Sequence, residues 1–169
     1  MMKISLLGFM ATGKSTVGRL LAREMELDFY ETDALIVEEE GRSIAQIFEV
    51  EGEAYFRQLE RIILKRVVTG EDDFVVSTGG GIVLAGDNRK LLKQETLPVL
   101  LEASPETIYK RSKEDGGRPL LEVKKPRQRI EELLEERREF YHCFENRIST
   151  EGKSPAEIVE EIKGLKEKI

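Results

Sequence analysis

The stretch Lys3-Ile4-Ser5-Leu6-Leu7-Gly8-Phe9-Met10-Ala11-Thr12-Gly13-Lys14-Ser15 decides the fold of this 169-residue chain. An apolar run suited to a buried strand leads into a segment that matches the pattern G-x-x-x-x-G-K-[ST], and a helix is expected to begin near Lys14. In such a loop, backbone N–H groups and the helix N-terminus surround phosphate oxygens, and the glycines permit a tight turn. The stretch therefore predicts a strand, a nucleotide-binding loop and a helix.

The side chains of this loop have separate expected tasks. Lys14 is expected to reach the β- and γ-phosphates, and the Ser15 hydroxyl to ligate Mg²⁺. A glycine-rich turn that binds nothing is the alternative, and the flanking strand and helix disfavour it. The predicted ATP contacts of the loop are Gly8, Ala11, Thr12, Gly13, Lys14, Ser15 and Thr16.

Short apolar runs and helical patterns alternate along the rest of the chain. Strands are predicted at 4–7, 27–30, 74–76 and 97–101, with a weaker fifth near 147–149. Helices are predicted at 16–25, 56–68, 126–144 and 155–165. Strands that alternate with helices indicate βαβ units, and the length fits one domain over 1–169. We therefore expect an α/β fold with a central, mainly parallel five-stranded sheet.

Composition excludes several classes of protein. The 27 Lys and Arg against 33 Asp and Glu give a net charge of −6, which disfavours a general nucleic-acid binder but permits a local basic pocket. The single cysteine cannot form an internal disulfide, and no His/Cys cluster suggests zinc. No apolar run approaches the ~20 residues of a membrane span. The expected protein is soluble and cytoplasmic.

The strand predicted at 74–76 runs into Ser77-Thr78-Gly79-Gly80-Gly81, where many ATPases place a Walker B aspartate. The chain also lacks the Asn-Lys-x-Asp motif of GTPase switches, and the Asp-Gly-Phe/Tyr-Pro-Arg motif usual in nucleoside monophosphate kinases. Three glycines at a strand end let the backbone approach a ligand closely. A flexible turn without a ligand is the alternative.

Arg137 occupies an unusual position on the helix predicted at 126–144. It falls in the middle of that helix's apolar stripe, where a charge needs a partner because an unpaired buried charge costs several kcal/mol. A guanidinium suits a carboxylate or phosphate, so the partner is either a bound anion or an internal glutamate. The stripe consists of Ile130, Leu133, Leu134, Tyr141 and Phe144.

Two further residues allow both a structural and a functional interpretation. Arg57 precedes Glu60 by three residues, so an ion pair along the helix is sufficient to explain it. Asp33 follows the strand predicted at 27–30, which we expect to lie next to the strand before the phosphate loop. It suits a helix N-cap, and it equally suits a carboxylate that binds a hydroxyl and accepts its proton.

Taken together, these pieces resemble shikimate kinases, a family with the nucleoside-monophosphate-kinase-like P-loop fold. They occur in the family's order and with similar spacing over most of the chain. The matching segments are Gly8–Ser15, Asp33, Gly41–Phe48, Gly52-Glu53 with Phe56-Arg57 and Glu60, Ser77–Gly81, Arg118–Leu121, and Arg137 before Tyr141.

The resemblance implies transfer of the ATP γ-phosphoryl group to the 3-hydroxyl of shikimate, with Mg²⁺ as cofactor, in aromatic amino acid (chorismate) biosynthesis. It implies that Arg57 and Arg137 hold the shikimate carboxylate beside Gly79–Gly81, with a backbone contact from Gly80. It implies that Asp33 binds the ring hydroxyls and acts as a base. It further implies a substrate-binding region at about 32–61 and a monomer without nucleic-acid or membrane partners.

The resemblance also assigns the nucleotide and metal surroundings. A mobile lid at about 112–125 closes Arg118 over the phosphates, although the segment's Gly and Pro content also fits an ordinary surface loop. Arg111 and Pro155 sandwich the adenine, and Ser77 helps to hold metal-bound water. The family commonly has Asp-x-Asp after the second strand, whereas this chain has Glu31-Thr32-Asp33. The resemblance therefore implies that Glu31 takes the place of the first aspartate and binds Mg²⁺ through water.

Two other functions fit part of this pattern. Another small-molecule kinase, such as a gluconate kinase, shares the phosphate loop and a polyol acceptor. A non-catalytic nucleotide-binding regulator needs the loop but not Asp33, Arg118 and both inward arginines together.

Overall fold

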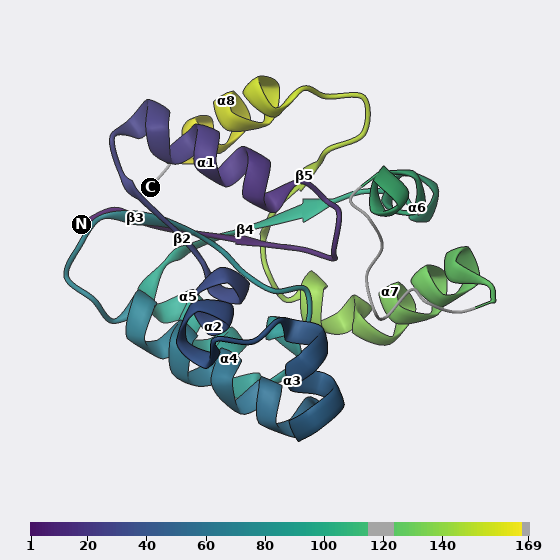
Figure 1. Ribbon diagram of the computed structural model, residues 1–169. Coiled ribbons are helices and arrows are strands. Elements are labelled where there is room, and N and C mark those ends of the chain that lie inside the picture. The colour runs from purple at the N-terminus through teal and green to yellow at the C-terminus, as the bar shows by residue number, and fades with distance from the viewer. Residues whose placement is uncertain (115–123, 167–169) are drawn as a thin grey trace.

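The computed structural model describes residues 1–114 and 124–166, which form a five-stranded sheet between helices (Figure 1). Every strand pairing is parallel, and the order is β2-β3-β1-β4-β5. All five predicted strands are confirmed, including the weak fifth. Their bounds are β1 (Lys3–Leu7), β2 (Asp28–Glu31), β3 (Phe74–Ser77), β4 (Leu97–Glu102) and β5 (Asn146–Ser149).

One expectation about the sheet is wrong. Among the described residues, strand β2 pairs only with β3, and β3 separates it from β1, so Asp33 does not follow a neighbour of the strand before the phosphate loop. The pattern of strands and helices constrains the handedness of each crossover but not which strand fills the place beside β1. Parallel strands nevertheless bring their carboxyl ends to one edge, where ligands bind in such sheets.

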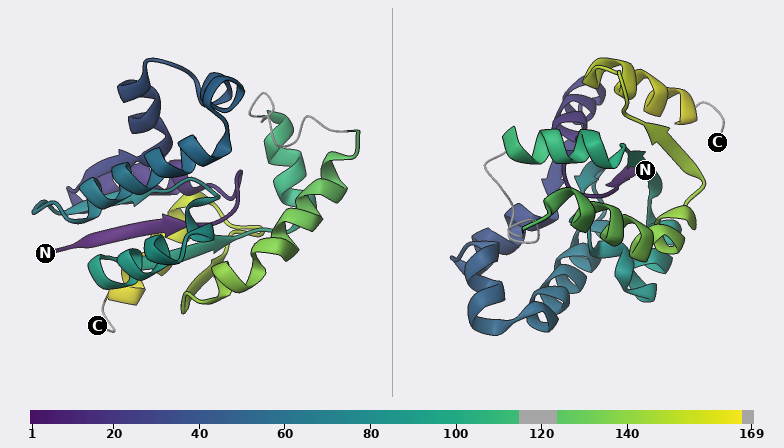
Figure 2. Two further views of the ribbon diagram at one scale, coloured as in Figure 1. Left: turned by 90° about the horizontal axis from the view of Figure 1, so that it is seen from below. Right: turned by 90° about the vertical axis from the view of Figure 1, so that its right-hand side faces the viewer.

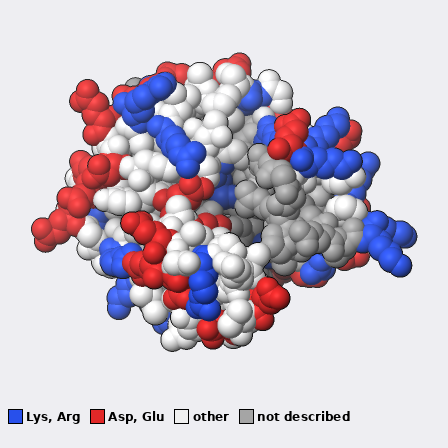
Figure 3. All heavy atoms as spheres, viewed as in Figure 1, with Lys and Arg blue, Asp and Glu red and all other residues white. Residues whose placement is uncertain are grey.

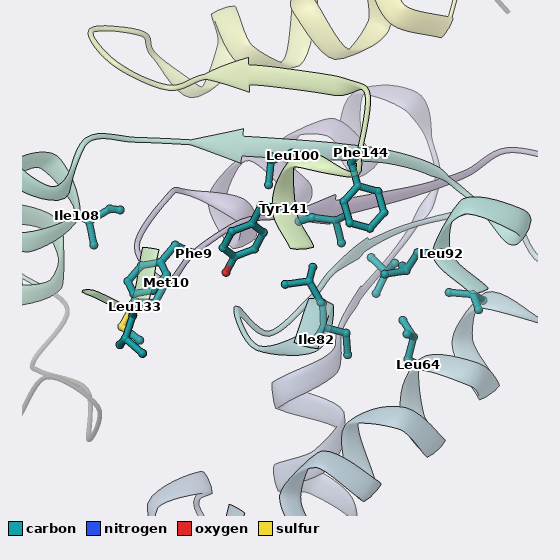
Figure 4. Close-up of a cluster of buried hydrophobic side chains, with 14 of the residues drawn as sticks. Phe9, Met10, Leu64, Ile82, Leu92, Leu100, Ile108, Leu133, Tyr141 and Phe144 are labelled. Carbon is teal, nitrogen blue, oxygen red and sulfur yellow. The ribbon is translucent and has the colours of Figure 1, made fainter. Parts of the chain in front are cut away.

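Helices cover both faces of the sheet and give the three-layer α/β/α architecture (Figure 1). Strand β1 shows why, because its side chains alternate between two separate cores. Ile4 and Leu6 pack with α1 and α8, whereas Leu7 belongs to the core on the opposite face, which Figure 4 shows. The four predicted helices are confirmed with shifted ends. They are α1 (Lys14–Met25), α4 (Glu53–Val68), α7 (Pro126–His142) and α8 (Pro155–Lys166).

Periodicity did not predict the shorter helices. In α2 (Thr32–Glu40) the apolar residues are consecutive, so no face stands out. The sequence of α3 (Ile44–Glu51) is short, and its start is fixed by a capping box in which Ser43 and Gln46 exchange hydrogen bonds. The other unpredicted elements are η1 (Ile82–Leu84), α5 (Gly86–Glu95) and α6 (Pro105–Glu114).

Helices α6 and α7 lie side by side at the carboxyl edge of the sheet (Figure 2). Residues 112–114 belong to the last turn of α6, while 115–123, with Arg118, fall outside the described residues. Within 1–114 and 124–166, no helix is long and apolar enough to cross a membrane. Acidic and basic side chains are mixed over the face seen in Figure 3, so the charges of the surface do not gather into one basic patch there.

Candidate active site

The phosphate loop leaves β1 at Gly8 and enters α1 at Lys14. Gly8 has φ +142° and Gly13 has φ +96°, conformations that favour glycine. The Lys14 ammonium is buried and donates to the carbonyls of Gly8 and Phe9 at 2.9 and 2.8 Å, so it lies across the mouth of the loop. The loop is therefore formed in the described structure, and the Lys14 ammonium is held against its backbone.

We expect Gly8→Ala to destabilise the protein more than any other single-methyl addition in this loop. A Cβ on Gly8 would lie 2.3 Å from the backbone oxygen of Leu101, in a backbone conformation that side chains avoid. Strained backbone and overpacking each cost about 1–3 kcal/mol. At roughly 2–4 °C per kcal/mol for a domain of this size, thermal unfolding followed by circular dichroism should show a loss of about 4–24 °C.

Gly41→Ala is the matched control for this prediction. Gly41 also has a positive φ, +62°, but a Cβ there meets nothing within 4 Å. Only the backbone term remains, about 1–2 kcal/mol. Equal losses of melting temperature in the two variants would contradict the proposed clash with Leu101.

Three oxygen-bearing side chains meet where α1 begins. The Ser15 hydroxyl donates to Glu31 Oε1 and lies 3.4 Å from Ser77 Oγ. The other oxygen of Glu31 accepts from Arg19 at 3.0 Å, which orients the carboxylate toward the loop. Mg²⁺ prefers oxygen ligands and usually keeps several waters beside one or two carboxylates and the phosphates, so these residues fit that ion.

The glycine triplet Gly79–Gly81 lies against side chains from two other helices. A Cβ on Gly79 would lie 2.8 Å from Asp33 Oδ1, and one on Gly81 would lie 2.3 Å from Arg57 Nη1. Glycine is thus required for α2 and α4 to bring these two side chains against the loop. Asp33 lies in the first turn of α2, whose N-cap is Glu31, so the N-cap interpretation of Asp33 is wrong.

The ion pair that sequence spacing allowed for Arg57 is present. Arg57 Nη1 donates to Glu60 at 2.5 Å, and its Nε and Nη2 donate to Glu53 at 3.3 and 3.2 Å. The side chain of Glu60 is 1% exposed and that of Glu53 is 60% exposed. The guanidinium is therefore held between a buried and a solvated carboxylate while it faces the glycine triplet.

Arg137 is buried on α7, as its place in the apolar stripe predicts. It is 5% exposed, and its guanidinium lies 5.6 Å from the centre of the Phe9 ring. Its positive charge opposes the rise in the pKa of Glu60, the buried acid that pairs with Arg57. This positive charge consequently contributes to the same end of the site as Arg57.

Tyr141, one turn after Arg137, connects α7 to the glycine triplet. Its hydroxyl donates to the Gly80 carbonyl at 2.6 Å. Burial raises the pKa of Tyr141 to about 12, against the opposing effect of Arg137, so the phenol keeps its proton at neutral pH. The resemblance included Tyr141 but assigned it no role; its position shows that it fixes the Gly80 peptide.

Two cavities join at the phosphate loop. One is lined by Lys14, Ser15, Glu31, Asp33 and the residues from Ser77 to Gly80. The other lies between the loop and the start of α8, and Arg111 enters it while donating to Thr150 at 3.2 Å. The second cavity is also lined by residues that no sequence motif predicted, such as Thr150 and Lys153, because they come from segments distant in the sequence. Its lining is Ala11, Thr12, Gly13, Thr16, Val17, Arg111, Glu114, Thr150, Lys153, Pro155 and Ile158.

The structure thus brings most of the predicted site residues to one edge of the sheet. The second cavity is lined by the predicted residues Ala11, Thr12, Gly13, Thr16, Arg111 and Pro155, and the first by Lys14, Ser15, Asp33, Gly79 and Gly80. Arg57 lies against Gly81 beside the first cavity, and Arg137 is buried over Phe9. Arg118 lies outside the described residues.

The fold and the two joined cavities define an α/β phosphotransferase of the P-loop kinase class. The family model described as shikimate kinase matches residues 10–165, which is most of the chain. The chain belongs to the shikimate kinase family, and with it to the ATP-dependent kinases.

Individual relatives support this membership. A shikimate kinase from Persephonella marina is 46% identical over 164 residues, which are 97% of this chain and 98% of that protein. A structure of shikimate kinase from Acinetobacter baumannii in complex with shikimate has a TM-score of 0.93 and 34% identity, and covers 98% of this chain and 92% of that one. A gluconokinase from Sinorhizobium meliloti has a TM-score of 0.56 and 19% identity, covers 95% of this chain and 88% of that one, and shares the fold alone.

Proposed function

We propose that the protein transfers the γ-phosphoryl group of ATP to the 3-hydroxyl of shikimate, giving shikimate 3-phosphate and ADP, in the route to chorismate and aromatic amino acids. The observation that carries this proposal is the placement of Arg57 against Gly81 and of the buried Arg137 near Phe9 and Glu60, next to a formed phosphate loop. Two inward guanidinium groups suit a carboxylate-bearing acceptor, and membership of the shikimate kinase family favours shikimate among such acceptors.

Each group in the site has a defined task in this reaction. Arg57 and Arg137 hold the carboxylate, the Gly80 backbone contacts it, and Asp33 orients the acceptor hydroxyl and accepts its proton. Lys14 neutralises charge that develops on the transferred group, which is typically the largest contribution to phosphoryl transfer. Stacking between Arg111 and Pro155 holds the adenine.

Mg²⁺ is the proposed cofactor. Ser15 would hold it directly, with Glu31 and Ser77 acting through water, and the ion would supply charge neutralisation at the phosphates. The direct contact between Ser15 and Glu31 supports this arrangement, because it holds the Glu31 carboxylate beside the hydroxyl that would ligate the ion.

We also propose that residues 32–61 form the substrate-binding region and that 112–125 form the lid, within a single domain. The enzyme is proposed to act as a cytoplasmic monomer without nucleic-acid or membrane partners. The net charge of −6 supports the absence of a nucleic-acid partner.

The proposed function is tested by an ADP-release assay with shikimate, gluconate and nucleoside monophosphates as acceptors. We expect turnover with shikimate to exceed that with the others by at least 10³-fold, because only shikimate offers both a ring hydroxyl and a matching carboxylate. Preferred turnover of gluconate would instead indicate the polyol-kinase function. ATP binding without turnover of any acceptor would indicate a nucleotide-binding regulator.

Replacing Arg118 tests the lid. We expect Arg118→Ala to lower kcat about 10²- to 10³-fold while KM for shikimate changes less than tenfold, since a lid arginine acts on charge present mainly in the transition state. Steady-state kinetics with both substrates varied measures this. A kcat equal to the parent's would contradict the role of Arg118.

A further inference from the structure

Glu60 is a buried acid to which the proposed reaction assigns no task. It lies on α4 with 1% of its side chain exposed, and its Oε2 accepts from Arg57. Its other oxygen, Oε1, is buried and has no hydrogen-bond partner among the described residues. A fully ionised carboxylate in such a place leaves half of its hydrogen-bonding capacity unused, which is costly.

A second acid lies close to this oxygen. A Cβ on Gly79 would be 2.7 Å from Glu60 Oε1 and 2.8 Å from Asp33 Oδ1, so both carboxyl groups approach the same point, one from α4 and one from α2. Two residues of α7, Arg137 and Tyr141, interact electrostatically with the Glu60 carboxyl group. Glu60 is thus faced by one carboxylate, one phenol and two guanidinium groups, counting Arg57 on its own helix.

The Arg57 guanidinium already pairs with two carboxylates before any substrate binds. Its three donating nitrogens are divided between Glu60 and Glu53. A substrate carboxylate at Arg57 would be the third carboxylate around one guanidinium, with Asp33 close by. When negative charge accumulates in this way, the carboxylate with the least access to water is the one that most readily takes up a proton, because burial penalises the charged form.

We propose that Glu60 takes up a proton from solvent when shikimate binds beside Arg57 and releases it when shikimate leaves, so that Glu60 neutralises the substrate's charge. This inference rests on the proposed function, because it takes shikimate as the anion. The reaction is balanced as Glu60 carboxylate plus one proton plus the shikimate anion giving neutral Glu60 with bound shikimate.

The ionisation of Glu60 in the free protein makes this uptake observable. Burial raises the pKa of Glu60 to about 7, more than Arg57 lowers it, and Asp33 adds to the rise while Arg137 opposes it. Most copies of Glu60 are therefore ionised at pH 7.5–8, and a further nearby anion shifts them toward the neutral form. Linkage is reciprocal, so shikimate must bind more weakly as pH rises above neutral.

Calorimetric titration of shikimate into the ligand-free protein at pH 7.5, in phosphate and in Tris buffer, measures the uptake. The difference in apparent enthalpy between buffers of different ionisation enthalpy gives the number of protons taken up. We expect roughly 0.5–0.8 proton per shikimate, and an up to about tenfold increase in Kd per pH unit above neutrality. In Glu60→Gln the uptake should fall below about 0.2, and Kd should lose its pH dependence.

Glu53→Gln is the matched control, because it removes the other carboxylate on Arg57 but leaves the buried proton site intact, so uptake should persist. If Glu60→Gln does not fold, the pH dependence of proton uptake by the parent protein still tests the inference. Its uptake must vanish below about pH 5.5, where Glu60 is protonated with or without substrate.

Shikimate binding without buffer dependence, or uptake that persists in folded Glu60→Gln, would overturn the inference and leave the proposed function standing. The absence of any shikimate binding would overturn both.

Discussion

We expect the Arg137→Ala variant to raise KM for shikimate by roughly 30-fold to several thousand-fold while KM for ATP stays within about threefold of the parent. Removing one partner of a buried charge pair costs about 2–5 kcal/mol, and each 1.4 kcal/mol is a factor of ten. Arg137 is 5% exposed and lies against Phe9, so no mobile surface group can replace its guanidinium. Initial-rate kinetics with each substrate varied separately measures the effect.

Arg138→Ala is the control for this variant. Arg138 is the next residue of α7, but its side chain is 60% exposed and pairs with Glu135 at 3.1 Å on the surface, so both KM values should be unchanged. A variant at Arg137 that changed only the affinity for ATP would contradict the assignment of the carboxylate.

The second large effect is expected at Lys14. Lys14→Met should lower kcat by at least about 10²- to 10³-fold, because the ammonium that neutralises the transferred group is lost while the loop backbone remains. The ammonium now donates to two loop carbonyls, so substrate phosphates would have to draw it away from Gly8 and Phe9. Single-turnover ADP formation at saturating ATP separates this loss from weaker binding.

Lys110→Met serves as the matched control for Lys14. Lys110 is 71% exposed on α6, where it pairs with Glu106 at 3.1 Å, and its loss should leave kcat unchanged. A kcat of Lys14→Met within threefold of the parent's would show that the loop backbone alone is sufficient for the chemistry.

Local patterns predicted the features that depend on neighbouring residues. The phosphate loop follows from one contiguous stretch, and the burial of Arg137 follows from helical spacing on α7, because each is determined by local geometry. The bounds of the short helix α2 were not predicted, since consecutive apolar residues show no period. The helix begins at Thr32, one residue before Asp33, so the N-cap interpretation of Asp33 failed on the position of the helix start.

Features that depend on distant segments could not be predicted in this way. The separation of β2 from β1 is decided by where β3 inserts, which local patterns do not encode. Lys153 and Thr150 line the second cavity because β5 and α8 return to the phosphate loop. The spacing of three residues predicted the pairing of Arg57 with Glu60. The burial of Glu60 was not predictable in this way, because it comes from packing against the glycine triplet.

The central claim is that the site directs the phosphoryl group of ATP to one hydroxyl of a carboxylate-bearing ring. The most direct measurement is proton–phosphorus correlation NMR on the product formed from shikimate and ATP. We predict a single phosphorus signal coupled to the ring proton at the 3-position, formed in equal amount to ADP. Phosphorus coupled to another ring position, or ADP formed together with inorganic phosphate alone, would contradict it.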